Sequence, residues 1–111
     1  MSAMAAGGEV QGGVHVGADA LEAFCRAALL AAGADDRTAD AATRAMMHGS
    51  RHGVDSHGVR LLDHYVAALA GGRVKARPQM RLASGFGAVA TLDADDGHGA
   101  LAAYEAMRHA V

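Results

Sequence analysis

The sequence predicts an α+β fold: a three-helix segment, then a β-hairpin, then the start of a further helix. Three observations support this prediction. Before residue 72, apolar residues recur at three- and four-residue intervals in three segments, which is the period of amphipathic helices. Two β-prone runs, 80–84 and 88–92, flank Gly85-Phe86-Gly87, a spacing typical of a hairpin. The helical period returns at residue 100 and continues to residue 111.

The first helix is expected to follow Asp19, a good N-cap, and to end near Gly33. The run Val14-His15-Val16 before it could form a short strand. The apolar stripe of the first helix includes Cys25, which we expect to be a buried structural thiol and not a reactive one.

Asp35 or Asp36 is expected to cap the second helix, which should run out between residues 49 and 53. The third helix is expected to begin near Ser56 and to close at Gly71-Gly72.

Three regions follow from this organisation. Residues 1–13 contain four glycines and no periodic pattern, so we expect a flexible tail. Residues 14–77 form a helical N-terminal domain, and residues 78–111 begin a second domain. The last helical pattern stops without a cap, a glycine or a polar tail, and alanine dominates a thin apolar core, so we expect either a truncated chain or an oligomer.

Composition excludes several classes of function. The formal net charge is −2, from 10 basic and 12 acidic residues, so nothing indicates a nucleic-acid-binding surface. No apolar run is long enough to span a bilayer, and the N-terminus lacks the pattern of a signal peptide. We therefore expect a cytoplasmic protein with no membrane partner.

Residues 53–60 hold the strongest candidate for chemistry. Asp55, Ser56, His57 and Arg60 lie within six positions, and glycines bracket the first three. Imidazole titrates near neutral pH, and the planar guanidinium group has paired N–H donors that match the two oxygens of a carboxylate. The residues themselves leave two interpretations open: proton transfer on a small acid, or a helix start capped by Ser56. Adjacent serine and histidine rarely form a nucleophile–base pair, since such pairs come from separated positions.

Two other patterns are weaker. His48 and His52 are spaced to share a helical face, but the usual companion glutamate is absent and the neighbouring arginine opposes a dication, so we expect no metal site. His15, His98 and His109 show no pattern and are expected at the surface.

The segment 95–99 precedes a helix and could cradle a phosphate. It lacks the three glycines of a dinucleotide fingerprint, however, and its paired aspartates would repel an anion. A capped turn between strand and helix is the favoured interpretation.

Taken together, these segments resemble the N-terminal region of the malate/L-lactate dehydrogenase family, a non-Rossmann family that includes ureidoglycolate, sulfolactate and diketogulonate dehydrogenases or reductases. The resemblance covers nearly the whole chain after residue 13. The most specific match is the Asp-Ser-His-Gly motif. The matching segments are residues 31–33, 51–62, Tyr65-Val66, Gly71-Gly72, Arg77-Pro78, 92–99 and Ala106-Met107.

The resemblance implies a fragment of the malate/L-lactate dehydrogenase-like fold, with residues 78–111 as the start of its cofactor-binding domain. It implies hydride transfer between NAD or NADP and a 2-hydroxy or 2-oxo acid, or a related imine, by a homodimer. His57 would exchange a proton with the substrate oxygen, Ser56 would lie beside the substrate, and Arg60 would pair with the substrate carboxylate. No residue is assigned to the cofactor.

Two departures from the family qualify this expectation. Many members carry the arginine one position later, where this chain has Leu61, and one position turns a helical side chain by about 100°. Family members are also about three times as long, so we expect the 111-residue chain alone to be inactive, because hydride transfer needs the cofactor. The alternative function is a non-catalytic helical binding module, or a remnant of such an enzyme.

Overall fold

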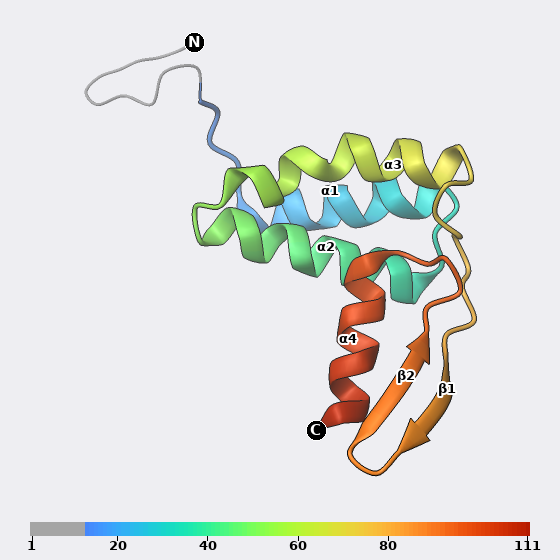
Figure 1. Ribbon diagram of the computed structural model, residues 1–111. Helices are drawn as coiled ribbons and strands as arrows, with labels where there is room; N and C mark the ends of the chain where they lie inside the picture. The colour runs from blue at the N-terminus through green and yellow to red at the C-terminus, as the bar shows by residue number, and fades with distance from the viewer. Residues whose placement is uncertain (1–12) are drawn as a thin grey trace.

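The computed structural model describes residues 13–111 and confirms the predicted α+β class (Figure 1). Three helices lie side by side, and a hairpin with a fourth helix extends from one end of them. The predicted tail lies outside the described residues, apart from residue 13. The elements are α1 (Ala18–Ala31), α2 (Asp36–Arg51), the 3₁₀ helices η1 (Asp55–His57) and η2 (Val59–Leu61), α3 (Leu62–Ala70), β1 (Arg81–Phe86), β2 (Val89–Asp93) and α4 (Gly99–Ala110).

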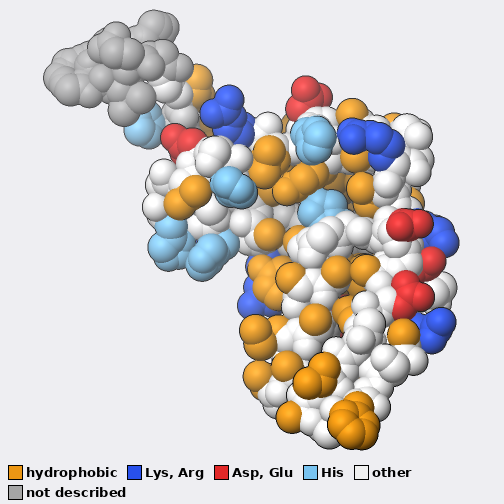
Figure 2. All heavy atoms as spheres, in the orientation of Figure 1, with side chains coloured by type: hydrophobic (Ala, Val, Ile, Leu, Met, Phe, Trp, Pro, Cys, Tyr) orange, Lys and Arg blue, Asp and Glu red, His pale blue; other side chains and the backbone are white. Residues whose placement is uncertain are grey.

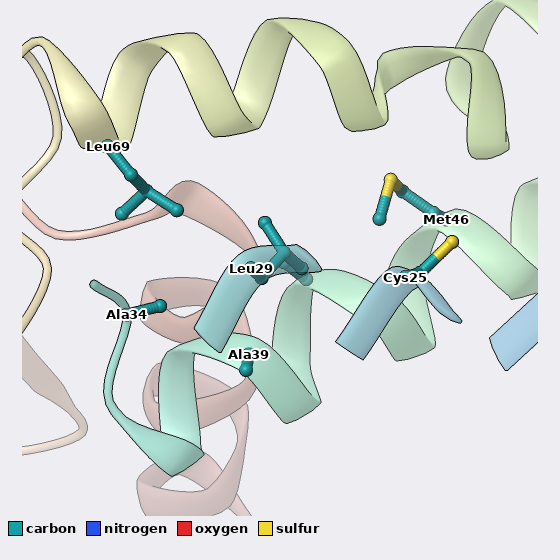
Figure 3. Close-up of a cluster of buried hydrophobic side chains, with 7 residues drawn as sticks. Cys25, Leu29, Ala34, Ala39, Met46 and Leu69 are labelled. Carbon is teal, nitrogen blue, oxygen red and sulfur yellow. The ribbon is translucent and has the colours of Figure 1, made fainter. Parts of the chain in front are cut away.

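The core lies between the three N-terminal helices (Figure 3). Small side chains make up much of it, so the helices approach closely but each residue buries little area. Cys25 is fully buried, and burial together with the charge of Glu22 raises the pKa of its thiol. A thiol that resists ionisation is a poor nucleophile, which agrees with the predicted structural role. The buried cluster comprises Cys25, Leu29, Ala34, Ala39, Ala42, Met46 and Leu69.

Local signals explain where α1 ends and α2 begins. Gly33 adopts a φ of 108°, a left-handed conformation that favours glycine after a helix. Asp35 is the N-cap of α2, as predicted, and its Oδ1 accepts a hydrogen bond of 2.8 Å from the Thr38 amide. The start of α1 differs from the prediction, because Gly17 and not Asp19 occupies the N-cap position. Residues 14–16 form no strand.

The third helix begins later than predicted. Ser56 lies in η1, and α3 starts only at Leu62. Gly58 separates η1 from η2 with an extended backbone, φ −103° and ψ −152°, which interrupts any continuous helix from Ser56. The motif is therefore a compact loop of two short turns, and it is not the first turn of α3.

The hairpin forms where it was predicted, with each strand displaced by one or two residues. β1 pairs antiparallel with β2 from Arg81↔Asp93 to Phe86↔Val89, with a bulge between Leu82 and Ser84. α4 lies beside the hairpin and packs against α2 (Figure 1). The connection from α3 is held by the turn before α4, since the Lys75 amide donates to the Asp96 carbonyl at 2.8 Å.

Candidate active site

The Asp-Ser-His-Gly motif is fastened to the C-terminal end of α2. The Val54 amide donates to the Gly49 carbonyl at 2.9 Å, which begins the loop. At its other end, the Val59 amide donates to Ser50 Oγ, also at 2.9 Å. Two bonds to consecutive residues of one helix therefore fix both ends of the loop that carries His57.

This close approach requires glycine on both sides. Gly49 is buried, and a Cβ added there would overlap the carbonyl oxygen of His57. A Cβ at Gly58 would overlap Ser50 Oγ. Neither φ is positive, so contact and not backbone conformation selects glycine at these positions. The predictions considered only the glycines flanking the motif and missed Gly49 and Ser50, which lie outside it.

Ser56 and His57 contact one another directly. Ser56 Oγ lies 2.9 Å from His57 Nδ1, within hydrogen-bonding distance, and both residues are exposed. The hydroxyl does not cap α3, so that interpretation of Ser56 is wrong. Because Nδ1 faces the hydroxyl, Nε2 is the ring nitrogen left to meet a ligand. The contact can fix the orientation of the imidazole, and because a hydroxyl both donates and accepts, it can serve either tautomer of the ring.

Arg60 lies in η2, three residues after His57, and is exposed. Within residues 13–111 it takes part in no ion pair, whereas several other arginines do. A 3₁₀ helix has about three residues per turn, so a shift of one position turns a side chain by about 120° there. The side chain of Arg60 is therefore rotated by about 120° from that of Leu61, the position at which the family resemblance would put the arginine.

His98 was expected at the surface, but it is only 6% exposed. Its Nδ1 accepts a hydrogen bond of 3.1 Å from the Ala100 amide and so caps α4. Its ring meets Tyr65 edge to face, with centroids 4.3 Å apart and planes at 88°. Burial lowers the pKa of His98, so the neutral form is favoured. A histidine directly before a helical pattern is the signal that could have indicated a cap.

The segment 95–99 is the capped turn that the sequence favours. Asp95 and Asp96 adopt positive φ values of 54° and 56°. The carboxylate of Asp95 accepts hydrogen bonds of 2.8 Å from the Gln79 amide and from Lys75 Nζ, which lower its pKa. This carboxylate is turned toward the protein and holds the connection between α3 and β1, so an anion cradle is not favoured.

A cavity of about 740 Å³ lies between the hairpin and α4, away from the motif. Phe86 and Val89 on its rim are 90% and 71% exposed, and Figure 2 shows apolar side chains gathered over this part of the molecule. The lining holds no lysine or arginine to meet the phosphates of a dinucleotide. Its larger members are Leu82, Phe86, Val89, Leu92 and His109.

Residues 13–111 contain no group of three or more His, Cys, Asp or Glu side chains placed to hold a metal ion. No helix in the same range has both the length and the apolar character needed to cross a bilayer.

Comparison with known proteins identifies the family. The family model described as malate/L-lactate dehydrogenase matches residues 16–111. Malate dehydrogenase of Pyrococcus abyssi is 28% identical over 98 residues, which are 88% of this chain and 27% of that protein. Hydroxycarboxylate dehydrogenase B of Escherichia coli O157:H7 gives the same identity and coverage.

The fold agrees as well. The structure of malate dehydrogenase from Pyrococcus horikoshii OT3 superimposes with a TM-score of 0.79 at 29% identity, covering 86% of this chain and 27% of that one. The chain thus spans about a quarter of the length of the relatives it matches. Because the family model covers nearly all of the described residues, the chain belongs to the malate/L-lactate dehydrogenase family.

Proposed function

We propose that this chain supplies the proton-transfer part of an oxidoreductase that moves hydride between NAD or NADP and a small 2-hydroxy or 2-oxo acid. The observation that carries the proposal is the 2.9 Å contact between Ser56 Oγ and His57 Nδ1 in a loop fixed at both ends. The names of its relatives, malate dehydrogenase and hydroxycarboxylate dehydrogenase, support the class of substrate.

His57 would act through Nε2. When Nδ1 carries the proton and donates to Ser56 Oγ, Nε2 has a free lone pair and can accept the hydroxyl proton of a 2-hydroxy acid. The imidazolium that results still donates from Nδ1 to the same oxygen, so Ser56 stabilises the ring before and after proton transfer. In the reverse direction Nε2–H returns the proton to the carbonyl oxygen of the oxo acid. Ser56 is thus the residue that orients the base.

Arg60 would hold the carboxylate of the substrate. It follows His57 by three residues on the adjoining turn, and its guanidinium is exposed, so a bound acid could contact both side chains. A nicotinamide cofactor would accept or donate the hydride. The cavity described above has no lysine or arginine in its lining to meet the phosphates of such a cofactor, so no residue of this chain is assigned to it. Residues 14–77 would form the motif-bearing domain and residues 78–111 the start of the cofactor-binding domain of a cytoplasmic homodimer.

A segment exchange tests the proposal. In hydroxycarboxylate dehydrogenase B, the 98 matched residues are replaced by the matching residues of this chain, and nicotinamide-dependent turnover of 2-hydroxy acids is measured. We expect the chimera to turn over substrate, and His57→Gln to lower kcat by about 10²–10⁴-fold, the usual contribution of a general acid–base. His64→Gln, an exposed histidine on α3, is the matched control and should leave kcat unchanged.

Two outcomes would contradict the proposal. If His57→Gln keeps more than about a tenth of the activity, His57 does not transfer the proton. A folded chimera without turnover would favour the alternative, a non-catalytic binding module, for which the exposed apolar face of the hairpin is the supporting observation. The 111-residue chain alone is expected to show no turnover. Turnover by it would show that its own residues suffice to bind the cofactor, contrary to the proposal.

A further inference from the structure

Two histidines lie side by side at the C-terminal end of α2, outside the proposed site: His48 in its last turn and His52 at its C-cap. His48 and His52 are four residues apart, and their ring centroids are 4.3 Å apart with planes inclined at 36°. Both side chains are exposed. Figure 2 shows histidine side chains in contact over this end of the molecule. Two imidazoles bound to one ion at right angles would have centroids about 4–5 Å apart, given a metal–nitrogen distance of about 2.1 Å.

A hydrogen bond fixes the tautomer of His52. Its Nδ1 lies 2.9 Å from the backbone carbonyl oxygen of His48. A carbonyl only accepts, so Nδ1 carries a proton, and in the neutral ring Nε2 is the nitrogen with the free lone pair. Histidines that bind metals commonly donate their other ring N–H to a carbonyl in this way, which orients the ring. In the neutral ring of this exposed residue, Nε2 is thus the nitrogen available to a metal ion.

The neighbouring positive charges are directed at other groups. The Arg51 guanidinium lies 3.6 Å from Glu22 Oε1, on α1. The Arg44 guanidinium lies over the ring of Tyr104, 4.5 Å from its centroid. The ion pair with Glu22 therefore reduces the repulsion between Arg51 and a dication, which had spoken against a metal site. The guanidinium of Arg44 is likewise directed at α4.

We infer that His48 and His52 form a two-imidazole site for a late first-row divalent cation. Imidazole suits Cu²⁺, Ni²⁺ and Zn²⁺, and Cu²⁺ binds most tightly to a given nitrogen site. Water would complete the coordination, since residues 13–111 bring no third His, Cys, Asp or Glu side chain to this place. The two histidines flank Gly49 and Ser50, which hold the motif loop, so an ion here also stabilises the turn on which His57 rests.

The test uses the 111-residue chain, titrated with CuCl₂, NiCl₂ or ZnCl₂ near neutral pH while thermal unfolding is followed by circular dichroism. All three ions should raise Tm, Cu²⁺ the most. His48→Ala and His52→Ala should each weaken Cu²⁺ binding at least tenfold, because each removes one ligand of the chelate. His64→Ala, an exposed helical histidine with no histidine four residues away, should bind as the unaltered chain does.

Paramagnetic resonance of bound Cu²⁺ gives a second measurement, in which two nitrogen ligands are expected in the unaltered chain and one in each variant. The inference is overturned if Cu²⁺ at 100-fold excess leaves Tm unchanged, or if either single variant binds as tightly as the parent. Equal losses in His64→Ala would also overturn it. Both substituted side chains are exposed, so the variants should keep their helical signal.

Discussion

Replacing His98 by alanine should destabilise the contact between α4 and the three-helix core. The substitution removes the acceptor of the Ala100 amide, and losing an N-cap of this kind costs about 1 kcal/mol. It also removes the edge-to-face contact with Tyr65, a type of pair that contributes about 0.5–1.5 kcal/mol beyond its buried area. Together these give a loss of about 2 kcal/mol, which corresponds to a fall in Tm of roughly 10 °C for a domain of this size.

Urea and thermal unfolding of the 111-residue chain, followed by circular dichroism, measure this loss. His98→Asn keeps a capping oxygen but not the aromatic contact, so it should recover about 1 kcal/mol. His109→Ala, an exposed histidine on the same helix, is the matched control and should change the free energy of unfolding by less than about 0.5 kcal/mol. A loss below about 0.5 kcal/mol for His98→Ala, or no difference between Asn and Ala, would refute the reasoning.

Three other predictions concern pH, the glycine contact and the motif. Burial lowers the pKa of His98, so the unfolded state binds more protons than the folded state as pH falls. The contribution of His98 to the free energy of unfolding should therefore be complete above the ordinary value of 6.5 and should be lost as pH drops below it. The prediction is contradicted if the free energy of unfolding depends on pH just as strongly in His98→Asn. Gly49→Ala should cost about 1–3 kcal/mol in urea unfolding through the overlap with the His57 carbonyl, whereas Gly99→Ala, where a Cβ meets nothing within 4 Å, should be neutral or stabilising. Ser56→Ala should shift the His57 tautomer equilibrium, seen as changed ¹⁵N shifts of Nδ1 and Nε2; unchanged shifts would mean that the hydroxyl does not orient the ring.

Much of the fold could be predicted because its signals are local. The cap at Asp35 and the left-handed turn at Gly33 both lie within a few residues of the helix ends they define. The hairpin was likewise indicated by glycines between two β-prone runs, and its strands form within two residues of the expected limits. Such features depend on the backbone preferences of neighbouring residues, which the order of amino acids states directly.

The predictions that were wrong concern features that depend on contacts with residues distant in the sequence. Ser56 has the chemistry of an N-cap, but the loop it belongs to is held by α2, and Gly58 takes an extended conformation against Ser50. His98 lies in a polar stretch that suggests a surface turn, yet Tyr65, 33 positions earlier, covers its ring. Neither contact has a signature in the local sequence, because each depends on how separate helices pack.

Gly49 links stability to the proposed chemistry. Glycine inside a helix costs about 1 kcal/mol relative to alanine, and Gly49 is the only glycine within α2. Helix propensity alone would favour alanine, as at several other positions of α2. The contact with the His57 carbonyl explains the choice, since any side chain would push the motif loop away from the helix. The preference for alanine over glycine inside a helix is thus overridden at the residue that contacts the His57 carbonyl. Such departures from local preference are expected at functional sites.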